Sequence, residues 1–148
     1  MDNTNEHDES HRPLALNLMA GLYLFFFLVS ASTFGNPFPF FGHIYEGTAA
    51  RILVFVDSIV CLYLFLGIMK RQILAWYSLL GYNLVEILNT VVNLRYIPLK
   101  DLEKFLGANV HQETLLTNNI AAALAILLLS QFIYRHKHYF TSRDKYIF

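Results

Sequence analysis

Four long apolar stretches constrain the fold of this chain more than any other feature of its sequence. They occupy residues 14–34, 49–69, 73–94 and 115–134. Each has about the 20 residues that an α-helix needs to cross the roughly 30 Å hydrocarbon core of a bilayer. We therefore predict an all-α integral membrane protein, with a four-helix transmembrane bundle of up-down-up-down topology.

The composition supports this class. Of the 148 residues, 55% are hydrophobic and 15% are charged, whereas about 25% of the residues in ordinary soluble domains are charged. The net charge is zero and the basic residues form no single stripe. The sequence therefore lacks the basic surface that nucleic-acid binding requires. The single cysteine, Cys61, lies in an apolar stretch, which excludes an internal disulfide and a multi-cysteine metal site. We expect it to be a small buried thiol.

The third stretch, residues 73–94, is the best candidate for a site because it carries Glu86 in its interior. A carboxylate at bilayer depth is costly unless it is protonated, paired or in contact with water. The polar residues of this stretch fall within an arc of roughly 120° on a helix. These residues are Tyr82, Asn83, Glu86, Asn89, Thr90 and Asn93. One face is therefore polar, and the other faces can meet lipid or apolar neighbours.

Asp57, in the second stretch, is predicted to lie at the depth of Glu86. Only residues 70–72 separate the second stretch from the third, so the two helices must be antiparallel neighbours. Asp57 precedes Arg71 by 14 residues, and Glu86 follows it by 15. Packed helices lie about 8 to 10 Å apart, so the two carboxyls can approach if both side chains point to the seam. Such a pair holds a proton, or shares a cation or a basic ligand, because two carboxylates do not both stay ionised cheaply in low dielectric.

Other polar side chains gather in the outer half of the predicted bundle, and a polar pocket open to the outside would explain them together. We predict a ligand or ion site made of Asp57, Glu86, Asn83, Asn89, Thr90, Asn93, Asn118 and Asn119. Alternatively, a protonated Glu86 and these amides form hydrogen bonds between helices, worth about 0.5 to 2 kcal/mol per contact, without any ligand. We predict no metal site.

The segments outside the four stretches differ in character. Residues 1–12 are polar and acidic, which predicts a disordered cytoplasmic tail, although a secretory signal peptide is an alternative for the N-terminal region. Residues 35–47 combine prolines and glycines with aromatic rings, so we expect a non-helical segment in the membrane interface, or a lid over a site. Residues 98–107 have one apolar helical face, which predicts a short interfacial helix between the third and fourth spans. Residues 135–148 form a basic cytoplasmic tail suited to anionic headgroups.

The distribution of lysine and arginine predicts the orientation. With four spans, one side carries Arg12, Lys70, Arg71, Arg135, Lys137, Arg143 and Lys145, and the other carries Arg51, Arg95, Lys100 and Lys104. Because basic residues are more frequent in cytoplasmic loops, this difference predicts that both termini lie in the cytoplasm. We expect the membrane to be the plasma membrane, or the inner membrane of a bacterium.

No common cofactor signature is present. All six histidines lie outside the apolar stretches, where a membrane haem would find no ligand, and the P-loop and HExxH patterns are absent. We therefore predict no cofactor, and the lipid bilayer as the main partner. The favoured function is transport or ligand binding, with a cation, proton or small ligand at the intramembrane carboxylates. The alternative is a non-catalytic accessory subunit that contacts another membrane protein or a second copy of itself. A lipid-modifying enzyme ranks third, because no nucleophile or metal set is visible.

Overall fold

The computed structural model describes residues 13–109 and 111–143, and it is mostly helical, as predicted. The helices are α1 (Leu14–Ser32), α2 (Gly47–Met69), α3 (Ile73–Tyr96), α4 (Leu99–Leu106), α5 (Gln112–Arg135) and the 3-10 helix η1 (Lys137–Tyr139). Among the described residues, α1, α2 and α5 are long and apolar enough to cross a membrane. The helix α3 is as long as α5, with 24 residues each, but one carboxyl and several amide side chains interrupt its apolar sequence.

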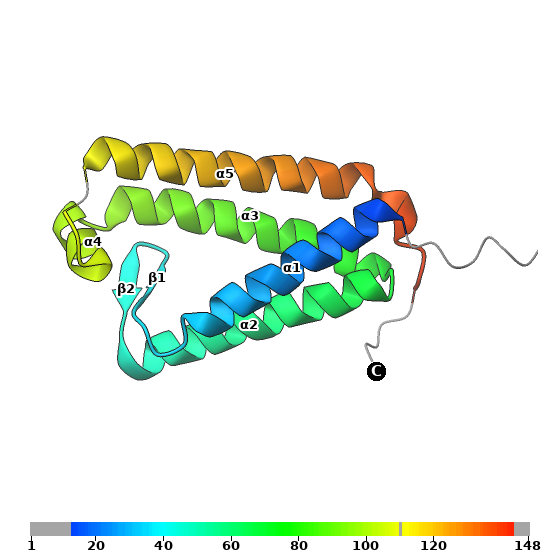
Figure 1. The fold of residues 1–148 in the computed structure, drawn as a ribbon, viewed down its shortest axis with the longest axis horizontal. Helices are drawn as coiled ribbons and strands as arrows, with labels where there is room; N and C mark the ends of the chain where they lie inside the picture. Colours follow the sequence, from blue (N-terminus) through cyan, green and yellow to red (C-terminus); the bar gives the residue numbers. More distant parts are fainter. Residues whose placement is uncertain (1–12, 110, 144–148) are drawn as a thin grey trace, which may run out of the picture.

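The four long helices form two pairs. The helix α1 packs along α2, and α3 packs along α5. The predicted short connection is present, since α2 ends at Met69 and α3 begins at Ile73. Figure 1 shows that the two pairs meet at this turn and diverge toward the opposite end.

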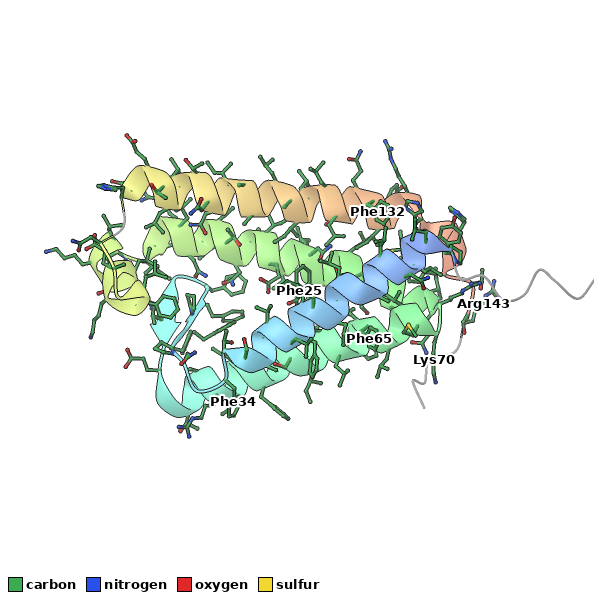
Figure 2. All side chains as sticks on the ribbon, viewed as in Figure 1. Phe25, Phe34, Phe65, Lys70, Phe132 and Arg143 are labelled. Atoms are coloured by element: carbon green, nitrogen blue, oxygen red, sulfur yellow. The ribbon has the colours of Figure 1, made fainter. Side chains whose placement is uncertain are left out.

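The main apolar core lies at the end where the pairs meet. It contains Leu16, Met19, Ala20, Tyr23, Leu64, Ile68, Trp76, Leu79, Ile133 and Phe140, which come from all four long helices and the C-terminal segment. In contrast, large apolar side chains also cover the outer surface, and Phe25 of α1, labelled in Figure 2, is 57% exposed. Such a surface is typical of helices that face lipid, and it is consistent with a membrane protein.

The described part of the C-terminal tail packs against the α2–α3 turn. The backbone N–H of Ile73 donates to the Ser142 carbonyl at 2.9 Å, and the Ser142 N–H donates to the Arg71 carbonyl at 3.0 Å. The Lys137 ammonium lies 4.5 Å from the centre of the Trp76 ring, a cation–π contact. Residues 136–143 therefore belong to the folded part of the chain. The predicted disordered tail, residues 1–12, lies outside the described residues.

A β-hairpin follows α1, in the aromatic segment that the sequence predicted to be non-helical. Strands β1 (Phe38–Phe40) and β2 (His43–Tyr45) pair antiparallel, with Phe40 opposite His43. Phe41 and Gly42 form the two-residue turn with φ of 42° and 84°, and positive φ at both positions is what a type I′ hairpin turn requires. In Figure 1 the hairpin lies between the diverging ends of α2 and α3, and β1 contacts both helices.

The short helix α4 is present where the sequence predicted it. It begins directly after Pro98 and ends before Gly107, whose φ of 65° is the left-handed conformation that glycine adopts readily at a helix C-terminus. Leu102 and Phe105 are half-buried, and Lys100, Asp101 and Lys104 are exposed. The helix therefore has an apolar face toward the protein and a charged face away from its core.

Candidate functional site

Asp57, Cys61, Tyr82 and Glu86 form a polar cluster between α2 and α3, which we name the carboxylate cluster. Asp57 and Cys61 are four residues apart on α2, and Tyr82 and Glu86 are four residues apart on α3. Side chains at this spacing share one helical face. Because α2 and α3 are antiparallel neighbours, the two faces meet at the same level.

Tyr82 links the two helices through its hydroxyl. The Tyr82 O–H donates to Asp57 Oδ1 at 2.9 Å, and Cys61 Sγ lies 3.3 Å from the same hydroxyl oxygen. A tyrosine has one O–H proton, so the thiol is the donor in the second contact. Cys61 is fully buried, as predicted.

Glu86 lies one helical turn beyond Tyr82 on the same face of α3, the face through which Tyr82 contacts Asp57 of α2. Its side chain is half-buried, like that of Asp57. Within residues 13–109 and 111–143, no basic side chain forms an ion pair with either carboxyl, and the Glu86 carboxyl accepts no hydrogen bond. The cluster therefore contains two acids, two weak O–H or S–H donors and no fixed cation.

Asn83 holds three helices together and does not face the carboxylate cluster. Its Oδ1 accepts a 2.7 Å hydrogen bond from the Tyr23 hydroxyl of α1, and its Nδ2 donates to Ser130 Oγ of α5 at 3.1 Å. Asn83 is only 1% exposed. Both polar atoms of its buried amide therefore form hydrogen bonds within the protein, as buried polar groups usually do. On the α1–α2 interface, the Ser30 and Ser58 hydroxyls form a similar contact at 3.0 Å.

Asn89 and Asn93 hold the hairpin turn. Asn89 Oδ1 accepts the Phe41 N–H at 2.8 Å, and Asn93 Oδ1 accepts the Gly42 N–H at 2.7 Å. Asn93 Nδ2 also donates to the Pro39 carbonyl at 3.3 Å and to Asn89 Oδ1 at 3.1 Å. We name this pair of amides the hairpin latch. Positions 82, 86, 89 and 93 follow one face of α3, so the hairpin turn lies one helical turn beyond Glu86 on the face that carries the carboxylate cluster.

The other predicted site residues form contacts within their own helices or none. Thr90 Oγ1 donates to the Glu86 carbonyl at 2.9 Å, and Asn119 Nδ2 donates to the Leu115 carbonyl at 2.8 Å. Asn118 is exposed on α5. The structure thus brings Asp57 and Glu86 together, places Asn83, Asn89 and Asn93 in interhelical and hairpin contacts, and leaves Asn118 and Asn119 on α5 outside the cluster.

The contacts of Tyr82 and Cys61 with the carboxylates were not predicted from the sequence. A usable signal was present, because each residue lies one helical turn from a carboxylate, on the side that faces the α2–α3 turn. Among the described residues, no group of three or more histidine, cysteine, aspartate or glutamate side chains could hold a metal ion.

The chain matches no protein-family model, and no curated protein or solved structure is significantly similar to it.

Proposed function

We propose that this chain is a four-span membrane protein that binds a proton or a small cation at the carboxylate cluster, as a step in transport. The observation that carries the proposal is the placement of Asp57 and Glu86 at the interface of two adjacent, largely apolar helices, without a basic partner among the described residues. Ionisable groups at membrane depth are typical of proton relays and ion pathways. The membrane is the plasma, or inner, membrane in this proposal.

The asparagine side chains of α3 are compatible with a fourth span because they form hydrogen bonds inside the protein. Asn83 bonds to Tyr23 and Ser130, while Asn89 and Asn93 bond to the hairpin backbone. The lipid-facing side of α3 is apolar, and Leu84, Leu88 and Val91 are exposed there. A bilayer tolerates polar residues in a span when they face protein partners. With α3 as a span, both termini lie in the cytoplasm and the hairpin and α4 lie outside.

A proton suits the donors of the cluster better than a metal cation does. Alkali and alkaline-earth cations prefer several oxygen ligands, whereas one of the four groups here is the thiol of Cys61. A proton that binds the Glu86 carboxylate neutralises one of the two acids, and Tyr82 continues to donate to Asp57. The pair then carries one negative charge in place of two, which costs less in low dielectric, and loss of the proton to the other side completes one transfer.

The hairpin closes the outer side of the cluster in this proposal. Its turn is held by the hairpin latch, one helical turn beyond Glu86. The three hydrogen bonds between these amides and the hairpin backbone are few enough to break during a transport cycle. In this proposal the hairpin is the lid that the sequence allowed for residues 35–47. The outer entrance to the carboxylate cluster is the space that the hairpin covers.

Proton flux through reconstituted protein tests the proposal. The full-length chain in vesicles with an entrapped pH dye should acidify or alkalinise the lumen when a potassium diffusion potential is applied. Asp57→Asn, Glu86→Gln and Tyr82→Phe should each remove most of the flux. Glu113→Gln, which changes an exposed carboxyl in the first turn of α5, should keep it. Equal flux in wild type, all three cluster variants and protein-free vesicles contradicts the proposal.

An accessory subunit is the second candidate, and the exposure of α5 favours it. This helix packs mainly against α3, few of its residues are buried, and Leu124, Leu127 and Leu128 are exposed. A partner helix could cover this face in place of lipid. This candidate predicts that the amide variants of Asp57 and Glu86 stay functional in cells and that a membrane protein copurifies in mild detergent.

A further inference from the structure

A cavity lies between the hairpin, the C-terminal end of α3 and α4, away from the carboxylate cluster. Its volume is about 670 Å³, within the range of about 300 to 1,000 Å³ that small-molecule sites occupy. Its charged lining residues are Glu46, Asp101 and Lys104, and its apolar and aromatic lining includes Ile44, Tyr96 and Phe105.

The walls of the cavity are set by contacts between segments distant in sequence. Gly42 of the hairpin turn packs so closely on α3 that an added Cβ would lie 2.9 Å from Tyr96 Cβ. The Gly42 N–H is also bonded to Asn93. Pro98 directly precedes α4, and Asp101, Lys104 and Phe105 of α4 line the cavity together with residues of the hairpin.

The cavity is lined by side chains of both charges that form no ion pair with one another. Within the described ranges, no ion pair joins Glu46, Asp101 or Lys104 to another charged side chain. Asp101 and Lys104 are three residues apart on α4, a spacing at which they could pair with each other, yet both line the cavity. A ligand with separate positive and negative groups would meet partners for both.

We propose that this cavity binds the headgroup of a zwitterionic phospholipid that carries a primary ammonium, with its phosphate at Lys104 and its ammonium at Glu46 and Asp101. A primary ammonium donates charge-assisted hydrogen bonds to carboxylates, which a quaternary ammonium cannot do. The inference rests on the membrane placement of the bundle proposed above, in which α4 lies at headgroup depth. It does not depend on the carboxylate cluster, so flux through the cluster and lipid binding can fail separately.

Lipid retention tests the assignment of the phosphate to Lys104. The full-length protein is reconstituted in nanodiscs with equal phosphatidylethanolamine, phosphatidylcholine and phosphatidylglycerol, released into mild detergent, and its bound lipids are counted by native mass spectrometry. Wild type should retain phosphatidylethanolamine over the other two lipids. Lys104→Gln should lower this retention about fivefold, the effect of losing one charge-assisted contact. Lys100→Gln, on the same helix but outside the cavity lining, is the matched control and should retain lipid like wild type.

The acidic residues are tested by the change in preference. The double variant Glu46→Gln, Asp101→Asn should lose the preference for phosphatidylethanolamine over phosphatidylglycerol, while Glu113→Gln on α5 keeps it. Retention that does not distinguish the three lipids, or that falls equally in Lys104→Gln and Lys100→Gln, overturns the proposal. Soluble glycerophosphoethanolamine is added in a last arm. Displacement of the lipid only at high excess supports a membrane lipid as the ligand, and equal affinity without acyl chains assigns the site to a soluble zwitterion and overturns the lipid assignment.

Discussion

At the scale of single residues, the approach of α2 to α3 beside their turn depends on Gly67. It is fully buried in the structure, and a Cβ added to it would clash with the Ala75 Cβ on α3. Gly67→Ala should therefore push the two helices apart and lower the free energy of unfolding by about 1 to 3 kcal/mol, the usual cost of overpacking. Thermal unfolding in detergent measures this.

Gly81→Ala is the control for this prediction. Gly81 lies in α3 with no atom within 4 Å of its added Cβ. Alanine should be neutral there or stabilise the helix by about 0.5 to 1 kcal/mol, because glycine is the poorer helix former. If both variants unfold at the same temperature, the tight contact at Gly67 does not limit stability.

The candidate site was predicted from the sequence in part, for a residue-scale reason. The short turn determines which residues of α2 and α3 lie at the same depth. Asp57 and Glu86 are almost equally far from the turn in sequence, so their similar depth could be predicted. The rotation of each helix about its axis depends on all of its packing contacts. For this reason the sequence did not reveal that Tyr82 and Cys61 join the acids, nor that Asn83 faces Tyr23 and Ser130 instead.

At the scale of elements, the hairpin latch is expected to keep the hairpin on α3. The backbone N–H groups of Phe41 and Gly42 donate hydrogen bonds to the two side chains of the latch. The double variant Asn89→Ala, Asn93→Ala should raise the hydrogen-exchange rates of both amides by roughly tenfold or more, since each lost bond is worth about 1 kcal/mol. Exchange followed by mass spectrometry measures this on the peptide that contains the hairpin.

Asn118→Ala is the matched control, because Asn118 is an exposed amide on α5. Its hairpin amides should exchange like those of wild type. Unchanged exchange in the double variant would show that apolar packing, for example of Gly42 against Tyr96, holds the hairpin without the latch.

The long helices and the hairpin differ in how far local sequence determines them. A stretch of about 20 apolar residues has few alternatives to a helix in a membrane, because its backbone groups must bond to each other. The helices α1, α2 and α5 were therefore predictable from length and composition alone. The pairing of β1 with β2 was not, because it depends on amides 48 and 51 residues further along the chain.

At the scale of the whole molecule, the proposed topology can be measured directly. Four spans would place the two ends of the chain on one side of the membrane, and the lysine and arginine distribution predicts that this side is the cytoplasm and that the loop around Asn109 lies outside. In a Cys61→Ser background, a cysteine at position 109 should react with a membrane-impermeant reagent in intact cells. Antibodies should reach tags at the two termini only after the cells are permeabilised. Labelling of position 109 only after permeabilisation would reverse the orientation, and tags on opposite sides would reduce the spans to three.

The last prediction separates a functional from a structural role for the two carboxyls in the bundle. If Asp57 and Glu86 are kept for proton binding, they cost stability, because neither has a basic partner in the described structure. The double variant Asp57→Asn, Glu86→Gln should then unfold at a higher temperature than wild type and lose proton flux.

A purely structural role predicts a different outcome for substitutions of Glu86. If a protonated Glu86 holds helices together, Glu86→Gln should be silent, because glutamine can donate the same bond, and Glu86→Leu should destabilise by about 1 to 2 kcal/mol. The proposed function leads us to expect the first outcome, and within residues 13–109 and 111–143 the Glu86 carboxyl accepts no hydrogen bond that a substitution would remove. We therefore expect both Glu86→Gln and Glu86→Leu to be at least as stable as wild type in detergent, and both to be inactive. A destabilised Glu86→Leu beside a fully active Glu86→Gln would instead assign the pair to helix association and leave the accessory-subunit function standing.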